Sequence, residues 1–323
     1  MNVWNWLSLL LLSASPGLAL AQAGPYPNKP IKLVVGFAPG GAADYVARTV
    51  GDSLGRALGQ TIVIENKAGA GSSIAADSVA KAAPDGYTLL IASPAAISVN
   101  PALNPKLGYS PKDLLPISKV TSSPLVIAAN PASGITSVRD LIAKAKAAPG
   151  SLNYATSGNG SAPHLGAALF SQIAGVQMQH IPFKGGAPAI QSVVAGDTQL
   201  TFGTPPSVLP MVQAGRLKGL AVSSKDRSAL VPDMPGMAEA GLPAYAIEFW
   251  YGFFVPAGTP PAVVKRLFEA TQQALQQPGV KAALAREGTE VSLSASPEGF
   301  ANFLADDAKF WVKLVKDADV KAE

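Results

Sequence analysis

The segment that most constrains this chain is an apolar strand that leads through a Pro-Gly-Gly turn into a helix. We expect the strand at residues 31–37, the turn at Pro39-Gly40-Gly41, and Asp44 in the first turn of the helix. The first N–H groups of a helix lack intrahelical acceptors and lie at its positive end, so they attract anions. Two adjacent glycines let a ligand approach the backbone closely. The segment predicts an anion site built from main chain, which favours binding over catalysis.

Composition limits the chemistry available to the chain. The 323 residues suffice for one large domain or two ordinary ones. The 25 Lys and Arg residues exceed the 21 Asp and Glu residues by four, but the sequence shows no basic run typical of nucleic-acid binding. The absence of cysteine excludes disulfides, thiolate catalysis and cysteine-based metal sites, and there are only two histidines. We therefore expect no metal, no cofactor and no nucleic-acid partner.

The first 21 residues resemble an export signal. Residues 7–12 form an apolar core, and Ala19-Leu20-Ala21 matches a small-x-small cleavage site, after which Gln22 would begin the mature protein. The segment before the core has no Lys or Arg, so a short membrane anchor is the alternative. Because the apolar run is shorter than the roughly 20 residues of a membrane span, we favour a signal peptide and a periplasmic location.

Strand and helix patterns alternate along the chain, which predicts an α/β fold with mainly parallel sheets. The helix at Ala42–Leu58 carries Val46, Val50, Leu54 and Leu58 on one face, and Gly59 ends it. A second unit is expected to begin after Pro124. The C-terminal part is mostly helical and is expected to return to the first unit.

Several expected strands end in Gly- or Ser-rich loops that open helices. These loops are Ser93-Pro94, residues 156–161, residues 183–186 and Gly203-Thr204. Open α/β sheets bind ligands at the carboxyl ends of their strands. The repeated pattern therefore predicts several loops around one binding site.

Three catalytic or nucleotide-binding motifs match only in part. Gly69-Ala70-Gly71 lacks the third glycine and the acidic residue of a dinucleotide loop. The Ser-x-x-Lys tetrad at 78–81 lacks its companion motifs and falls within an expected amphipathic helix. A serine hydrolase could be built from Ser157 or Ser161 with His164, but no Gly-x-Ser-x-Gly elbow is present. We therefore interpret these three partial matches as coincidental and not as catalytic or nucleotide-binding sites.

Four polar residues near these loops keep two interpretations each. Asp44 either stabilises its helix and turn or holds a ligand group or water. Lys184 either pairs with a carboxylate or is a solvated loop residue. His164 is either a ligand contact or a hydrogen-bonding residue behind the site, and for His180 we favour a structural role.

Seven further motifs are spread over essentially the whole mature chain. They are YPNKPI at 26–31, FAPGGAAD at 37–44, ENKAGAG at 65–71, AKAAPDGYTLL at 80–90, YATSGNGS at 154–161, HIPFKGGAPA at 180–189 and FFVPAGTP at 253–260. In these motifs and in their order the sequence resembles the extracytoplasmic solute receptors of the tripartite tricarboxylate transporters, the Bug family.

The resemblance implies a two-domain periplasmic binding protein of the type II, Venus-flytrap kind. Domain 1 would comprise residues 22–123 and 247–323, and domain 2 residues 124–246, with hinges near 121–124 and 244–249. Carried over residue by residue, the ligand site has contributions from both domains. Its residues are Phe37, Ala38, Gly40, Gly41, Asp44, Ser93, Pro94, Ala95, Ser157, Asn159, Gly160, Ser161, His164, Phe183, Lys184, Gly203 and Thr204.

The function implied is capture of a small organic carboxylate and its delivery to the membrane subunits of a transporter by a monomeric, non-enzymatic receptor. Dicarboxylates and aromatic carboxylates, terephthalate among them, are within the family's range. Many relatives carry Asp where this chain has Gly203-Thr204, which weakens the case for an amino-acid ligand. A sensory receptor that presents a bound carboxylate to a signalling partner shares every one of these features, and a serine hydrolase is the third alternative.

Overall fold

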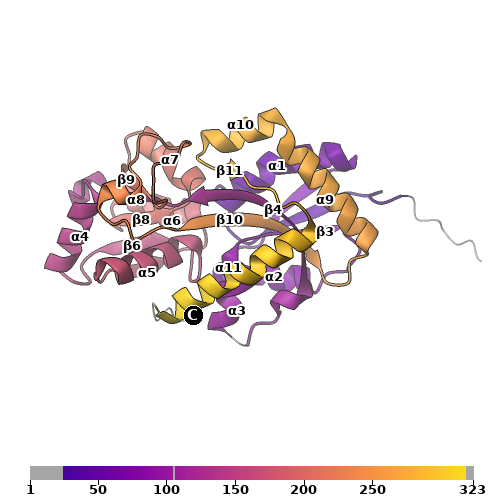
Figure 1. The fold of residues 1–323 in the computed structure, drawn as a ribbon, viewed down its shortest axis with the longest axis horizontal. Helices are drawn as coiled ribbons and strands as arrows, with labels where there is room; N and C mark the ends of the chain where they lie inside the picture. Colours follow the sequence, from indigo (N-terminus) through magenta and orange to yellow (C-terminus); the bar gives the residue numbers. More distant parts are fainter. Residues whose placement is uncertain (1–24, 105, 318–323) are drawn as a thin grey trace, which may run out of the picture.

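The computed structural model describes residues 25–104 and 106–317. The expected signal peptide at 1–21 lies outside these residues. The chain forms two lobes, each with its own sheet, joined by two long adjacent strands that run between them (Figure 1). Two α/β domains are therefore confirmed.

The first lobe contains a six-stranded sheet in the order β11-β4-β10-β3-β1-β2. Its strands are β1 (Ile31–Val35), β2 (Ile62–Asn66), β3 (Thr88–Ala92), β4 (Leu114–Pro124), β10 (Glu248–Pro256) and β11 (Glu290–Val291). Its helices are α1 (Ala42–Leu58), α2 (Ser73–Ala80), α3 (Asn100–Leu103), α9 (Pro261–Gln276), α10 (Pro278–Arg286) and α11 (Pro297–Asp317). The C-terminal helices therefore return to the first lobe, as the sequence predicts.

The second lobe contains a five-stranded sheet in the order β7-β6-β8-β5-β9. Its strands are β5 (Val126–Ala129), β6 (Asn153–Thr156), β7 (Gln179–Pro182), β8 (Leu200–Gly203) and β9 (Lys218–Val222). Its helices are α4 (Val138–Ala147), α5 (Ala162–Ala174), α6 (Gly186–Ala195), α7 (Pro205–Gln213) and α8 (Met237–Ala240).

Both sheets are mixed, and the expectation of mainly parallel sheets is wrong. In the first lobe β1 pairs in parallel with β2 and β3, but β10 is antiparallel to β3 and β4, and β11 is antiparallel to β4. In the second lobe β6 is parallel to β7 and β8, whereas β5 is antiparallel to β8 and β9. The antiparallel pairs arise because β4, β5 and β10 carry the chain between the lobes.

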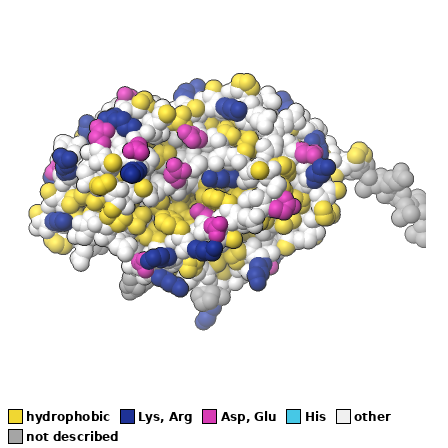
Figure 2. Space-filling model, in the orientation of Figure 1, with side chains coloured by type: hydrophobic (Ala, Val, Ile, Leu, Met, Phe, Trp, Pro, Cys, Tyr) yellow, Lys and Arg dark blue, Asp and Glu magenta, His cyan; other side chains and the backbone are white. Residues whose placement is uncertain are grey.

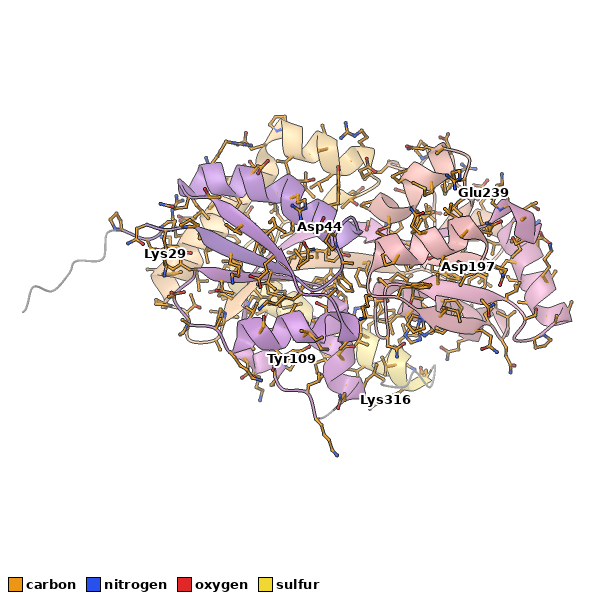
Figure 3. The ribbon with its side chains drawn as sticks, turned by 180° about the vertical axis from the view of Figure 1, so that it is seen from behind. Lys29, Asp44, Tyr109, Asp197, Glu239 and Lys316 are labelled. Atoms are coloured by element: carbon orange, nitrogen blue, oxygen red, sulfur yellow. The ribbon has the colours of Figure 1, made fainter. Side chains whose placement is uncertain are left out.

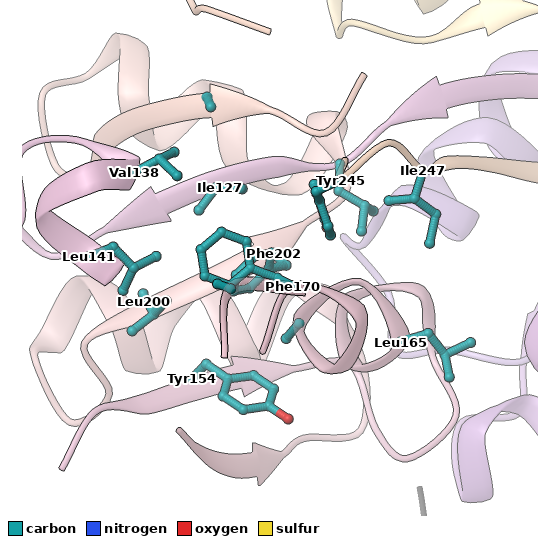
Figure 4. Packing of buried hydrophobic residues seen from close by; sticks show 14 of the residues in the cluster. Ile127, Val138, Leu141, Tyr154, Leu165, Phe170, Leu200, Phe202, Tyr245 and Ile247 are labelled. Atoms are coloured by element: carbon teal, nitrogen blue, oxygen red, sulfur yellow. The ribbon is translucent and has the colours of Figure 1, made fainter. Parts of the chain in front are cut away.

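Each lobe has its own core on the faces of its sheet. The predicted apolar face of α1 is buried, with Val46, Val50 and Leu54 at 1 % exposure or less, and Gly59 ends the helix in the left-handed region. In the second lobe aromatic and aliphatic side chains of β5, β6, β8 and α5 pack together (Figure 4). The two cores hold the carboxyl ends of β1 and β6 in fixed positions, and these ends position the site.

The surface carries mixed charge. On the face shown in Figure 2, basic and acidic side chains are interspersed over both lobes. Within residues 25–104 and 106–317, none of the helices combines the length and apolarity needed to cross a membrane.

Candidate functional site

The Pro-Gly-Gly turn opens α1 as predicted, and Asp44 holds it in place. One carboxylate oxygen, Oδ2, accepts the N–H of Gly40 at 3.0 Å and the Nε–H of Arg48 at 2.9 Å. The other oxygen accepts the Nδ2–H of Asn66 at 3.0 Å, and the same amide donates to the carbonyl of Phe37. Both oxygens are therefore engaged within the first lobe. This geometry supports the structural interpretation of Asp44.

The charge of Asp44 is stabilised where it lies. Burial raises the pKa of its carboxyl, but the hydrogen bonds from Arg48, Gly40 and Asn66 outweigh burial and hold the pKa below its ordinary value. Figure 3 shows Asp44 at the start of α1, where that helix faces the second lobe. Within the described chain, the N–H groups of Ala42 and Ala43 have no acceptor, so they remain available to an anion.

The second lobe presents a comparable helix start at α5. Ser161 stands at its N-cap, but its hydroxyl donates to the carbonyl of Gly158 and does not cap the helix. Among the described residues, no acceptor is recorded for the N–H groups of Ala162 and His164. Pro163, between them, has no N–H. The start of α5 therefore also leaves donors free.

A stack of three rings lies behind this loop. The ring of His164 stacks on that of His180 at 3.8 Å between centroids, and His180 stacks on Tyr154 at 5.2 Å. The Nδ1 atom of His164 accepts the N–H of Gly160 at 3.1 Å. Burial lowers the pKa of His164 to about 3, helped by repulsion from His180, and burial lowers that of His180 to about 4. Both rings are therefore neutral at pH 7.

The loops of the two lobes meet, and we call this region the inter-lobe junction: residues 37–41 and 69–73 and Asn100 of the first lobe, residues 158–161 and 183–187 of the second. The N–H of Ala38 donates to the carbonyl of Lys184 at 3.1 Å. A Cβ on Gly160 would lie 2.4 Å from the Oδ1 atom of Asn100, and one on Gly185 would lie 2.9 Å from the nitrogen of Ala38. Contacts this close require glycine.

The junction brings together most of the residues expected to bind ligand. Ala38, Gly40 and Gly41 face the start of α6, while Asn159 and Gly160 face Gly71 and Asn100. Lys184 takes part through its backbone, since its side chain is exposed. Gly158 lies between the 183–187 loop and Gly71, because a Cβ there would lie 3.3 Å from the carbonyl oxygen of Phe183 and 3.8 Å from the nitrogen of Gly71.

The remaining expected residues lie around this region in different ways. Ser93, Pro94 and Ala95 are buried at the end of β3, where a π-helical turn begins. Thr204 is the N-cap of α7, and its hydroxyl lies 3.5 Å from that of Ser207, whose side chain packs on Gly186. Gly203 is buried against α7. Ser157 is half-buried, and its side chain makes no hydrogen bond to the other described residues.

Two buried hydroxyl groups at the end of the first sheet were missed by the sequence reasoning. The hydroxyls of Ser72 and Ser98 are buried and, like that of Ser93, have no hydrogen-bond partner within the described chain. Buried polar groups ordinarily have partners, so these hydroxyls are available to a ligand or to water. Ser72 also adopts a left-handed φ of 77°. A non-glycine residue in that region is uncommon, and its sequence context gives no signal of it.

The geometry does not support the hydrolase alternative. The hydroxyl of Ser161 donates to Gly158, and the Nδ1 atom of His164 accepts from Gly160, so the two side chains do not form a nucleophile–base pair. Ser78 lies within α2 and hydrogen bonds to Lys67 and Ala75. No group of three or more metal-ligating side chains occurs within residues 25–104 and 106–317.

Comparisons with known proteins agree with this geometry. Residues 46–320 match the model of the family described as the tripartite tricarboxylate transporter family receptor. The chain is 36 % identical over 325 residues to the protein BugT of Bordetella pertussis, covering 99 % of each chain.

Solved structures of similar proteins include two with bound acids. A protein of R. palustris solved with adipate is 32 % identical, with a TM-score of 0.87 over 92 % of this chain and 99 % of its own. MatC from Rhodopseudomonas palustris, solved with bound malate, is 32 % identical, with a TM-score of 0.84 over 90 % of this chain and all of its own. The periplasmic binding protein BugD is 33 % identical, with a TM-score of 0.87 over 92 % of this chain and all of its own.

Proposed function

The chain belongs to the tripartite tricarboxylate transporter receptor family, and we propose that it captures a small organic carboxylate in the periplasm and delivers it to such a transporter. The family consists of solute-binding receptors, so the chain is a receptor and not an enzyme. The observation that carries the proposal is the pairing of two helix starts with free N–H groups, one on each lobe. Adipate and malate in two relatives support a carboxylate as the ligand class.

The two helix starts and the buried hydroxyls near the end of the first sheet provide donors suited to a carboxylate without a cationic side chain. Free N–H groups at the starts of α1 and α5 carry partial positive charge, and the hydroxyls of Ser72, Ser93 and Ser98 lack partners among the described residues. A dicarboxylate or an aromatic carboxylate fits this set, with terephthalate among the candidates. The ligand would be held mainly by main chain and hydroxyl groups.

Closure of the two lobes would complete the site. The long strands β4 and β10 pair from Glu248 opposite Pro124 to Pro256 opposite Leu114, and they carry the chain between the lobes. We propose domain boundaries near 124 and 247, with hinges at 121–124 and 244–249. A ligand that contacts both lobes would shift the population toward the closed state.

Isothermal titration of the mature protein with adipate, malate and terephthalate tests the ligand class. We expect at least one diacid to bind, with compaction measured by small-angle scattering. Hexane-1,6-diamine is the matched control, because it has the six-carbon chain of adipate with the opposite charge. Binding of the diamine in preference to all the acids, or of none of these compounds, would show that the ligand class is wrong.

Delivery to a transporter is tested separately in cells. We expect deletion of the gene to abolish uptake of the acid that binds in vitro, and a plasmid copy to restore it. If uptake persists while transcription no longer responds to that acid, the protein is a sensory receptor and the transport role is wrong. This experiment thereby separates the two alternatives.

A further inference from the structure

The third helical residue, N3, performs the same task in three helices of this protein. Asp44 in α1 accepts the N–H of Gly40, Asp140 in α4 accepts that of Thr136, and His164 in α5 accepts that of Gly160. In each case the acceptor is the N3 side chain and the donor precedes the N-cap. This bond fixes the chain as it enters the helix. The three helices differ in the charge that the acceptor brings.

At the helix remote from the junction the acceptor carries an unpaired charge. Asp140 is half-buried on α4, and it forms no ion pair with any of the described residues. A carboxylate is the favourable choice there, because negative charge stabilises the positive end of a helix. The same carboxylate beside a ligand site would repel an anionic ligand.

At the two junction helices that negative charge is either balanced or absent. The carboxylate of Asp44 pairs with Arg48 at 2.9 Å and also accepts from Asn66. In α5 the acceptor is an imidazole, which supplies a lone pair without a negative charge. His164 is 7 % exposed, and the titratable groups that face it are His180 from β7 and, behind that ring, Tyr154 from β6.

We propose that His164 is a positioning residue that fixes the 158–161 loop through a neutral acceptor, so that the positive end of α5 stays available to the ligand's carboxylate. This inference rests on the proposed function. The bond to Gly160 requires that the Nδ1 atom carry no proton, so the proton of the neutral ring is on Nε2. Arg48 plays the corresponding part in α1 by balancing the charge of Asp44.

His180 holds the other end of the same loop. Its Nε2 atom lies 2.6 Å from the hydroxyl oxygen of Thr156, and that oxygen accepts the N–H of Gly158 at 3.2 Å. The N–H groups of Gly158 and Gly160 are therefore both fixed by the stacked pair, one directly and one through Thr156. The loop that leads into α5 therefore has a defined shape, and this fixes the position of the free N–H groups of Ala162 and His164 at the start of that helix.

Three substitutions at one position separate the acceptor from its charge. His164→Asn keeps a neutral acceptor near the Nδ1 position, His164→Asp keeps the acceptor and adds a negative charge, and His164→Leu removes the acceptor. Titration with adipate and malate is expected to give affinities within threefold of wild type for the Asn variant. We expect a loss of about tenfold for Leu and at least 100-fold for Asp. Equal affinities for the Asn and Asp variants would overturn the proposal.

Arg48→Gln provides a second test at a half-exposed side chain. It leaves the Asp44 charge unbalanced, so we expect a fivefold to tenfold loss of affinity for adipate and malate that shrinks at high salt. Asp140→Asn is the matched control in α4, and its affinity should equal that of wild type. If the Asp variant at 164 does not fold, equal affinities of wild type, His164→Leu and Arg48→Gln would refute the inference.

Nitrogen-15 NMR of the wild-type protein gives a readout that does not need a ligand. We expect the His164 ring to carry its proton on Nε2 and to keep that form down to pH 5. A proton on Nδ1 would overturn the inference whatever the ligand is. Failure of wild type to bind any of the acids tested above would instead count against the proposed function.

Discussion

The N-termini of α4 and α5 begin with the same residue type and use it differently. Ser137 caps α4 by accepting the N–H of Asp140 at 3.1 Å, whereas the hydroxyl of Ser161 turns back to the carbonyl of Gly158. The third residue of α4 is a carboxylate that has no ion pair among the described residues, and that of α5 is a neutral imidazole. An N-terminus that only has to be stable is capped and made negative. One that faces the other lobe stays uncapped and carries no unbalanced negative charge, which is the arrangement an anion needs.

The largest expected effect comes from adding a methyl group to a glycine before one of these helices. Gly160 has a φ of 68°, and a Cβ there would meet the Oδ1 atom of Asn100, whose amide is held by Ala70, Gly71 and Ser73. Gly160→Ala should therefore hold the lobes apart and lower ligand affinity at least 100-fold, as measured by calorimetry.

Gly134, before α4, is the matched control for this substitution. Its φ is 65°, but a Cβ there would meet only the tip of the Lys144 side chain, at 3.0 Å. Both alanine variants should lose about 1–2 kcal/mol of stability, because both place alanine in the left-handed region. Only Gly160→Ala should lose affinity and the compaction on binding. Equal affinities in the two variants would show that closure does not depend on this contact.

The second effect is the dependence of stability on pH, which follows from the neutral rings behind α5. The unfolded chain protonates each histidine near pH 6.5, while the folded chain keeps the pKa values of His164 and His180 at about 3 and about 4. Between these limits the unfolded state binds more protons, so stability falls as the pH drops below 6.5. Each histidine contributes a slope of up to about 1.4 kcal/mol per pH unit.

Urea unfolding at pH 7 and pH 5 measures this contribution. The loss of stability between the two pH values should be about 2 kcal/mol smaller in His164→Asn than in wild type, since one of the two buried rings is gone. An unchanged difference would mean that His164 is protonated in the folded protein, and the contrast with α4 would then lose its electrostatic basis.

The starts of α1 and α5 also show how much of the structure can be predicted from the sequence. The bounds of α1 and its end at Gly59 were predicted because spacing and caps are local signals. The recurring loop-then-helix pattern was found for the same reason. The spacing from Ser161 to His164 is that of a capping box with His in place of Glu, so a side-chain acceptor at this helix start could have been anticipated, although a capping box would pair it with the N–H of Ser161 and not with that of Gly160. The stacking on His180 could not, because it depends on how β7 lies beside β6.

The elements that the sequence did not reveal depend on distant partners. The strand β4 contains Pro116 and ends in Ser122-Ser123-Pro124, which is typical of a loop. It is a strand because β10, more than 120 residues later, pairs with its whole length. The mixed sheets follow from the same long-range pairing. The orientation of the Ser72 hydroxyl depends on the left-handed φ of Ser72, which the neighbouring residues do not predict.

The third effect concerns the hydroxyl that turns away from its helix. Ser161→Ala removes the bond to the Gly158 carbonyl and loosens the loop that presents the free N–H groups of α5. We expect about a tenfold loss of affinity, with a small change in stability, because one hydrogen bond contributes about 1 kcal/mol. Titration and thermal unfolding of the same preparation measure both quantities. A loss of stability without a loss of affinity would contradict the proposed role of this loop.

The smallest effect is the reciprocal one at α4. Ser137→Ala removes a true N-cap, so the free energy of unfolding should fall by about 1 kcal/mol. Affinity for adipate or malate should stay within twofold of wild type, since α4 does not take part in the inter-lobe junction. The two serine variants should therefore lose a similar amount of stability, and only Ser161→Ala should also lose affinity. If Ser137→Ala weakened binding as much as Ser161→Ala, the difference between the helices would reflect general loosening of the second lobe and not the division between a capped helix and an open one.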